Sequence, residues 1–193
     1  AVFGSAAAGF RAMTSSAGTA MSLKQEGMAH MAYMEMPGLI VDMMRGGPGL
    51  GNIIATQGEY NQAAHGGGNG DYRCLVLAPA TVQEMADFMG LAKELMFKWR
   101  MPAIILSDGL IGQMMEKVVL PDYQPRRTDE EIREQCPWAT NGLGLKNRRY
   151  NFTTSLELEA PLMQDRNRAM TAKYDEICEK EVRYEEYKTD DAE

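Results

Sequence analysis

The sequence predicts an α/β protein in which a doubly wound, mainly parallel sheet is flanked by helices. Helical segments separate three short runs of largely apolar residues, and strands that alternate with helices are typical of βαβ units with a parallel sheet. Nearly continuous apolar character indicates strands that are buried on both faces of such a sheet. The three expected strands are Leu39–Met44, Cys74–Leu77 and Ala103–Leu106.

One helix end, a short strand and a second helix are expected before the first of these runs. Ala1–Ala8 has the composition of a helix end, and Gly9 is a typical stop. Phe10–Met13 suggests a short β segment that leads into the hydroxyl residues Thr14–Ser16, which are common helix caps. The second helix would then span about residues 17–35. Helical spacing predicts that one face of it carries Leu23, Gly27, Met31 and Met34.

Two later segments carry the signature of a helix start. Thr81 and Glu84 match the capping-box pattern, in which each side chain binds a free backbone amide at the helix terminus. The helix that they begin should continue to about Trp99. Thr128–Glu131 has the same pattern and predicts a further short helix.

A change of composition near residue 121 suggests two parts of the chain. We expect an α/β domain in residues 1–121, with its start truncated, and a connector in residues 122–193. The connector would begin irregularly, through the Gly/Asn-rich stretch Asn141–Asn147, and continue as a long charged helix within Leu158–Tyr187. Asp190–Glu193 would mark a stop before a further domain. The helix carries a narrow apolar stripe, suited to packing on a neighbouring domain or subunit: Met163, Met170, Tyr174 and Ile177.

The most informative stretch of the chain lies after the first apolar run. Leu39–Met44 leads directly into Arg45 and then into the glycine-rich segment Gly46–Asn52, and a second glycine cluster follows at Gly66–Asp71. Ligands of open α/β sheets lie outside the carboxyl ends of the strands, and glycine lets the backbone approach a ligand closely. A long loop inside a compact domain is usually functional. The alternative is a solvent-exposed loop that carries a surface arginine.

Bulk composition excludes several classes of function. A net charge of −7 argues against nucleic acid as the main partner, because nucleic-acid binding depends on basic surface. No apolar run approaches the ~20 residues that span a bilayer, and the start at Ala1 has no basic segment of the kind that precedes a signal peptide. Cys74, Cys136 and Cys178 are odd in number and form no CxxC, which favours a reducing, cytoplasmic compartment. The chain opens without methionine, so we expect residues before Ala1 to be missing.

Motif searches alone do not complete an active site. The sequence holds no HExxH, no Walker A motif and no GxSxG elbow, and Gly47, Gly49 and Gly51 have the wrong spacing for the dinucleotide fingerprint. His30 lies in an expected helix and should be structural. His65 adjoins a glycine cluster and could touch a ligand, although a solvated histidine fits better. We expect no metal site in this chain.

Met43–Asn52 resembles the corresponding segment in the alpha subunit of 2-oxoacid:ferredoxin oxidoreductases. The similar types are the 2-oxoisovalerate (3-methyl-2-oxobutanoate) enzymes, with the 2-oxoglutarate enzymes close behind. The resemblance covers nearly the whole chain and keeps the order of its blocks, so it is specific for the family and weaker for the substrate. The other blocks are Met13–Ser16, Ser22–Gly27, Gly66–Tyr72, Leu77–Pro79, Asp108–Gly109 and the connector-like Glu181–Tyr187.

The resemblance implies a subunit that acts only with partner subunits. The fold would be the domain that holds the pyrimidine ring of thiamine diphosphate. A beta subunit would hold the diphosphate and Mg²⁺, and iron–sulfur clusters on partner subunits would take the electrons. The reaction would be oxidative decarboxylation of a small 2-oxoacid to an acyl-CoA and CO₂, with ferredoxin and coenzyme A as partners. The family's Tyr-Pro-Ile-Thr-Pro segment and its activating glutamate would precede Ala1, and the following domain is absent too.

The resemblance also assigns roles to individual residues. Arg45 matches the family's arginine that faces substrate and cofactor, and its guanidinium can hold a carboxylate through two hydrogen bonds. No catalytic residue is expected within this chain, and Asp108 is expected to form a turn with Gly109 rather than bind a ligand. Residues expected to bind or shape the cofactor site are Thr14, Ser15, Ser16, Gly47, Gly49, Gly51 and Asn52.

Two other functions compete with an oxidoreductase subunit. The chain could be a scaffold module with the same fold but without chemistry, serving subunit assembly. It could also be a free-standing phosphate- or nucleotide-binding domain, although the missing glycine fingerprints argue against this. The residues before Ala1 would separate the scaffold from the enzyme subunit.

Overall fold

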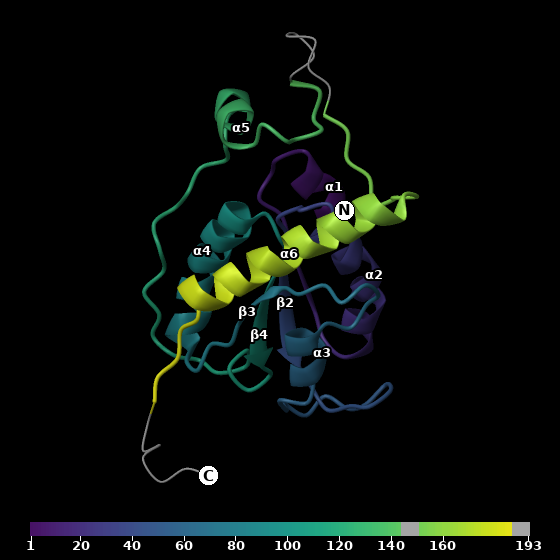
Figure 1. Cartoon of the computed structure of the whole chain (residues 1–193). Coiled ribbons are helices and arrows are strands. Elements are labelled where there is room, and N and C mark those ends of the chain that lie inside the picture. The colour runs from purple at the N-terminus through teal and green to yellow at the C-terminus, as the bar shows by residue number, and fades with distance from the viewer. Residues whose placement is uncertain (144–150, 187–193) are drawn as a thin grey trace. The chain divides into compact units, whose positions relative to one another are not determined.

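The computed structural model describes residues 1–143 and 151–186, and the chain divides into two compact units, residues 1–155 and 156–193. The first unit is built on a four-stranded sheet (Figure 1). Its order is β1-β2-β4-β3, and every neighbouring pair is parallel, which confirms the predicted α/β fold. The strands are β1 (Met13–Ser16), β2 (Leu39–Met44), β3 (Leu75–Leu77) and β4 (Ala103–Asp108).

Helices cover both faces of this sheet. On one face, α2 (Thr19–Tyr33) and α3 (Tyr60–His65) pack on side chains such as Ile40 and Ile104 in a continuous buried cluster. Because strand side chains alternate between faces, Val41 and Ile105 point to the other face. There α4 (Val82–Trp99) contacts β2, β3 and β4. Burial on both faces explains why β2, β3 and β4 are largely apolar.

Two short helices extend the core beyond the sheet. The first, α1 (Val2–Ala7), ends before Gly9, as predicted, and buries Ala6 in a cluster with Met31 of α2 and with Met34 and Met36, which follow that helix. The second, α5 (Asp129–Gln135), buries Ile132 in a separate cluster with Cys136. Gly9 lies in contact with this cluster, and a Cβ built there would lie 2.8 Å from Ile132 Cγ2. The chain segment that precedes β1 is thereby packed against α5.

The predicted helix cap at residues 14–16 is wrong. Thr14, Ser15 and Ser16 belong to β1 itself, where they pair with Ile40, Val41 and Asp42 of β2. Their backbone is therefore extended and lies before the helix start. Gly18 is the N-cap of α2, and no side chain caps it.

The predicted inward face of α2 is also wrong in part. Leu23 is 84% exposed, whereas Met31 is buried as predicted. Besides Met31, the helix buries Met21, Gln25, Met28 and Ala32. Because Gln25 is polar, a prediction based on the spacing of apolar residues does not place it on the buried face. Its Oε1 accepts a hydrogen bond of 2.5 Å from the hydroxyl of Tyr72, which explains how an amide is accommodated inside.

The two predicted capping motifs form to different degrees. The hydroxyl of Thr128 accepts a hydrogen bond from the Glu131 amide at 3.3 Å, and the Thr128 amide donates to Glu131 Oε2 at 2.7 Å. This completes the capping box of α5. At α4, Thr81 accepts from the Glu84 amide at 3.1 Å, but the Glu84 carboxylate binds the amide of Ala80, one residue earlier than the motif requires.

The second unit contains the long helix α6 (Ala160–Lys180), which lies within the predicted helical segment and has Pro161 in its first turn. Parts of three predicted segments lie outside the described residues. They are residues 144–147 of the irregular stretch, Tyr187 of the connector-like block, and Asp190–Glu193. Residues 122–155 cluster with the first unit, so a functional boundary at residue 121 stays a prediction. Within the described residues, none of the helices combines the length and the apolar character that a bilayer crossing requires.

Candidate functional site

The carboxyl ends of the four parallel strands lie at one edge of the sheet. They are Ser16, Met44, Leu77 and Asp108. Ser16 lies beside Asp42 in the register, and Met44 lies beside Asp108. The predicted glycine-rich loop leaves from this edge directly after β2. The structure therefore places the loop where open α/β sheets bind ligands.

The glycine-rich loop after β2 is closed on itself by backbone hydrogen bonds. The amide of Gly46 donates to the carbonyl of Ile54, and the amide of Asn52 donates to the carbonyl of Gly46, both at 2.9 Å. The Asn52 side chain adds a turn by accepting from the Ile54 amide at 2.9 Å. Gly51 has φ +62°, and a Cβ there would lie 1.8 Å from the Gly46 carbonyl oxygen. This position can therefore hold only glycine.

Arg45 is partly engaged by the loop that follows it. Its Nη1 donates to the carbonyls of Leu50 at 2.6 Å and Asn52 at 3.2 Å, and its backbone forms an isolated bridge with Ala55. The guanidinium lies against Gly18, at the turn between β1 and α2. Within residues 1–143 and 151–186, Nε and Nη2 have no hydrogen-bond partner. The Nη1 group of the guanidinium thus holds the loop, whereas Nε and Nη2 lie next to Gly18 without a hydrogen bond to any described residue.

Two carboxyl groups lie next to each other at this edge, and sequence reasoning missed both. Asp42 is only 1% exposed within β2, and Glu59 is the N-cap residue of α3. Burial, helped by the neighbouring Glu59 carboxyl, raises the pKa of Asp42 to about 8, although the positive charge of Lys24 opposes this shift. Asp42 therefore holds a proton at neutral pH. A carboxylate inside an otherwise apolar strand was the signal that could have identified it.

Lys24 links this acidic pair to β1. Its ammonium group donates a hydrogen bond to the hydroxyl of Ser16, which neighbours Asp42 in the register. In the described part of the chain, Asp42 Oδ1, Glu59 Oε2 and Gln25 Nε2 are buried polar atoms without a hydrogen-bond partner. Buried polar atoms usually have partners, so the free oxygens of Asp42 and Glu59 at this edge suit a polar ligand.

The other predicted cofactor-site residues are only partly brought together. Thr14 and Ser16 share the face of β1 that α2 covers, whereas Ser15 lies on the opposite face and is exposed. Thr14 lines a cavity of about 270 Å³ together with Lys24. Gly47 and Gly49 lie on the exposed part of the loop, with no atom near enough to contact an added Cβ. Their role in binding a cofactor stays a prediction.

Asp108 forms the predicted turn. Its Oδ1 accepts a hydrogen bond of 2.5 Å from the Leu110 amide. Gly109 lies so close to β2 that a Cβ would be 2.8 Å from the Met44 carbonyl oxygen. Of the two histidines, His30 forms a hydrogen bond with Ser155, in which its Nδ1 lies 2.7 Å from Oγ. In residues 1–143 and 151–186, no three His, Cys, Asp or Glu side chains cluster as metal ligands.

Comparison with known proteins gives several related enzymes. The chain is 48% identical over 192 residues to the ketoisovalerate oxidoreductase subunit VorB of Methanothermobacter thermautotrophicus, covering 100% of this chain and 53% of that protein. It is 41% identical over 123 residues to the 2-oxoglutarate synthase subunit KorA of Methanocaldococcus jannaschii, covering 63% of this chain and 33% of that one. The chain thus spans about half the length of VorB and a third of KorA.

A solved structure has the same fold. It is the 2-oxoglutarate:ferredoxin oxidoreductase from Magnetococcus marinus with 2-oxoglutarate, coenzyme A and succinyl-CoA bound. The TM-score is 0.71 at 22% sequence identity, and the match covers 94% of this chain and 35% of that chain. At this identity the likeness establishes the fold alone.

The family model described as "Pyruvate flavodoxin/ferredoxin oxidoreductase, thiamine diP-bdg" matches residues 1–189, which is nearly the whole sequence. The sheet edge with its glycine-rich loop therefore belongs to a thiamine-diphosphate-binding domain, and the chain is a member of the pyruvate flavodoxin/ferredoxin oxidoreductase family.

Proposed function

We propose that this chain is part of a subunit of a thiamine-diphosphate-dependent 2-oxoacid:ferredoxin oxidoreductase that uses 2-oxoisovalerate. The assembled enzyme would convert the 2-oxoacid and coenzyme A into an acyl-CoA and CO₂ and pass the electrons to ferredoxin. The observation that carries the proposal is the 48% identity to a ketoisovalerate oxidoreductase subunit across the entire chain. The similarity to a 2-oxoglutarate synthase subunit covers only 63% of the chain, which favours the branched-chain substrate.

Arg45 is our candidate for binding the substrate carboxylate. Its Nη1 is held by the carbonyls of Leu50 and Asn52, and this fixes the orientation of the guanidinium plane. The Nε–Nη2 edge can then offer two parallel N–H donors to a carboxylate. Because the loop already holds the side chain in place, little conformational entropy is lost when the substrate binds.

The residues at this sheet edge suit the ring end of thiamine diphosphate better than its charged end. An aminopyrimidine has both donors and acceptors, and the edge offers buried acceptors on Asp42 and Glu59. A diphosphate needs cations, and the three-ligand metal cluster that would bring Mg²⁺ is not found among the described residues. When bound, the cofactor supplies carbanion stabilisation, and the protein supplies orientation and electrostatics.

This assignment makes partner subunits part of the active enzyme. A beta subunit would hold the diphosphate with Mg²⁺, and iron–sulfur clusters would lie on partner subunits, in a cytoplasmic hetero-oligomer. Within this chain, Arg45 would orient the 2-oxoacid. Asp42, whose pKa is raised to about 8, would keep a proton at the buried edge beside Glu59.

The test is steady-state oxidation of 2-oxoisovalerate by the assembled enzyme with a dye acceptor. Arg45→Ala should lower kcat/KM by roughly ten- to a hundredfold, because a charge-assisted hydrogen bond of ~1.5–3 kcal/mol is lost. Arg45→Lys should recover only part of the activity, since an ammonium group cannot reproduce the planar fork. Comparison with 2-oxoglutarate as substrate measures the substrate preference.

Arg133→Ala is the matched control, because Arg133 pairs with Glu130 on the surface of α5, away from the loop after β2. It should leave the kinetics unchanged. If Arg45→Ala behaves like this control, Arg45 serves only to hold its loop. If the assembled natural complex oxidises no 2-oxoacid at all, the scaffold module becomes the better assignment.

A further inference from the structure

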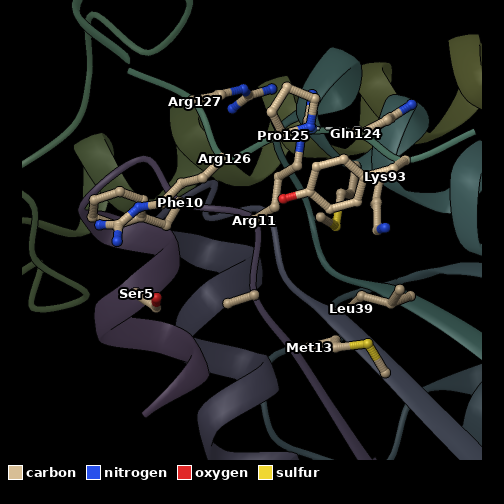
Figure 2. A pocket seen from close by; sticks show the side chains of 13 residues that line it. Ser5, Phe10, Arg11, Met13, Leu39, Lys93, Gln124, Pro125, Arg126 and Arg127 are labelled. Atoms are coloured by element: carbon tan, nitrogen blue, oxygen red, sulfur yellow. Dashed lines mark hydrogen bonds between the residues drawn. The ribbon is translucent and has the colours of Figure 1, made fainter. Parts of the chain in front are cut away.

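Another cavity lies at the amino ends of the strands, at the edge of the sheet opposite to the one that carries Arg45. Its volume is about 720 Å³, which is within the range of small-molecule sites. Met13 and Leu39, the first residues of β1 and β2, form part of its wall, so it opens at the amino ends of the strands. The segment Tyr123–Arg127 forms another wall (Figure 2).

The charged side chains that line this cavity are all cationic. They are Arg11, Lys93, Arg126 and Arg127, and no Asp or Glu lines it. The other ionisable group in its lining is the Tyr123 phenol. Within residues 1–143 and 151–186, none of the four forms an ion pair. Four unpaired cations around one cavity are unexpected in a chain of net charge −7, and they create a local positive field that attracts anions.

Aromatic rings hold two of the guanidinium groups in place. Arg126 lies over the ring of Phe10 at 4.6 Å, as Figure 2 shows, and Arg127 lies over the ring of Phe97 at 4.2 Å. Arg127 is also tied to the fold, because its Nη1 donates to the Gly9 carbonyl at 3.4 Å. Stacking on an aromatic ring leaves the N–H groups at the rim of the guanidinium free to bind oxyanions.

Arg11 reaches the same cavity from the chain segment before β1. Its Nη1 donates to Gln124 Oε1 at 3.1 Å, which connects this segment to the wall formed by residues 123–127. Burial lowers the pKa of Arg127, and the positive charge of Arg11 lowers it further. Arg11 and Arg127 therefore repel each other, although Glu131 and Cys136 act on the pKa of Arg127 in the opposite direction. An anion between them would relieve this repulsion.

We propose that this cavity binds a small polyanion, whose phosphate or carboxylate oxygens are held by Arg11, Arg126 and Lys93. Arg127 serves mainly to hold the wall in place through its contacts with Gly9 and Phe97. A small ligand fits better than a long acidic segment, because the binding groups gather around a single cavity of about 720 Å³. The proposal does not depend on the oxidoreductase function, since none of these residues lies at the carboxyl edge.

The experiment is isothermal titration calorimetry of the full-length protein in its natural complex, at low salt and without added metal ions. Inorganic pyrophosphate and citrate are the two probes, because they distinguish phosphate oxygens from carboxylate oxygens. Arg126→Gln is the main variant, since the described contact of that side chain is with Phe10 and the fold should survive its loss. Lys93→Gln and Arg11→Gln are the second and third variants.

One further variant provides the control. Arg133→Gln removes a surface charge that does not line the cavity. We expect binding of at least one probe with an affinity that falls tenfold or more in Arg126→Gln and in Lys93→Gln, and that is unchanged in Arg133→Gln.

Binding of pyrophosphate alone would assign phosphate-bearing ligands, and binding of citrate alone would assign polycarboxylates. Binding of both would assign a general polyanion site. The proposal is overturned if neither probe binds at millimolar concentration. It is also overturned if the affinity persists in Arg126→Gln, Lys93→Gln and Arg11→Gln while circular dichroism shows that these variants are folded.

Discussion

The guanidinium of Arg45 occupies the space that a side chain on Gly18 would need. A Cβ built at Gly18 would lie 2.5 Å from Nη2 and 2.6 Å from Cζ of Arg45. Gly18 also has φ +57°, in the left-handed region where side chains are strained. The turn between β1 and α2 and the arginine after β2 are therefore coupled through one glycine.

Gly18→Ala should disturb Arg45 without removing it. The strained backbone should cost about 1–3 kcal/mol of stability, and the displaced guanidinium should reduce kcat/KM in the same direction as Arg45→Ala. Denaturant unfolding and steady-state kinetics measure the two effects. Gly90→Ala is the matched control, because Gly90 lies inside α4 with no atom within 4 Å of an added Cβ. That change should stabilise the protein by roughly 0.5–1 kcal/mol. Unchanged kinetics in Gly18→Ala would mean that the two residues are independent.

The capping box of α5 gives a prediction about stability alone. Thr128→Ala removes the hydroxyl that accepts from the Glu131 amide and should destabilise the protein by about 0.5–2 kcal/mol. Thr128→Ser keeps an acceptor at the same position and should lose much less. Urea unfolding of both variants measures the difference. An equal loss in the two would show that the methyl group of Thr128, rather than its hydrogen bond, stabilises this helix start.

Local patterns predicted most of the sheet. The bounds of β2 are those expected, because its apolar run is both buried and flanked by Pro37–Gly38 and Arg45. The run Ala103–Leu106 continues in the structure to Asp108, since pairing with Met44 extends β4 past the point where apolar character ends. β1 was misplaced because Thr14–Ser16 has the composition of a cap, and only pairing with β2 makes it a strand.

The site was predictable only where it depends on neighbours in sequence. Arg45 could be placed at the carboxyl edge of the sheet because it directly follows a buried strand. The contact between Asp42 and Glu59 could not be foreseen, since it depends on how the long loop returns to the sheet before α3. The cationic cavity combines Arg11, Lys93 and Arg126, which come from three separate segments. No local pattern brings such residues together.

The three cysteines should differ sharply in reactivity. Burial raises the pKa of the Cys74 thiol to about 12, and burial also raises the pKa of Cys136. Cys178 is exposed on α6. Because the thiolate is the nucleophile, iodoacetamide at mildly alkaline pH should modify Cys178 first and the other two slowly. Mass-spectrometric peptide mapping over time measures each rate, and unfolding in guanidinium chloride should equalise them. Early modification of Cys74 in the native protein would contradict the raised pKa of its thiol.

Asp42 should make the stability of the protein depend on pH in an unusual direction. Its pKa is raised from the ordinary 3.8 to about 8, so the native state binds this proton more tightly than the unfolded state does. Its contribution to the unfolding free energy therefore falls as the pH rises between these two values, and the loss is complete above the higher one. Asp42→Asn cannot ionise and keeps the group neutral. The variant should thus gain little over the wild type at about pH 4–5 and gain most at about pH 9.

Urea unfolding of Asp42→Asn and of the wild type across this pH range tests the sign of the effect. Glu116→Gln is the control, because Glu116 is exposed and is not among the groups that shift the pKa of Asp42. Glu59→Gln is the informative partner variant. It removes the carboxyl group that helps to raise the pKa of Asp42, so the pH dependence of its stability should weaken without disappearing, since burial is the larger cause. If Asp42→Asn is instead less stable than the wild type at alkaline pH, the attraction of Lys24 outweighs burial, and Asp42 is ionised in the native protein.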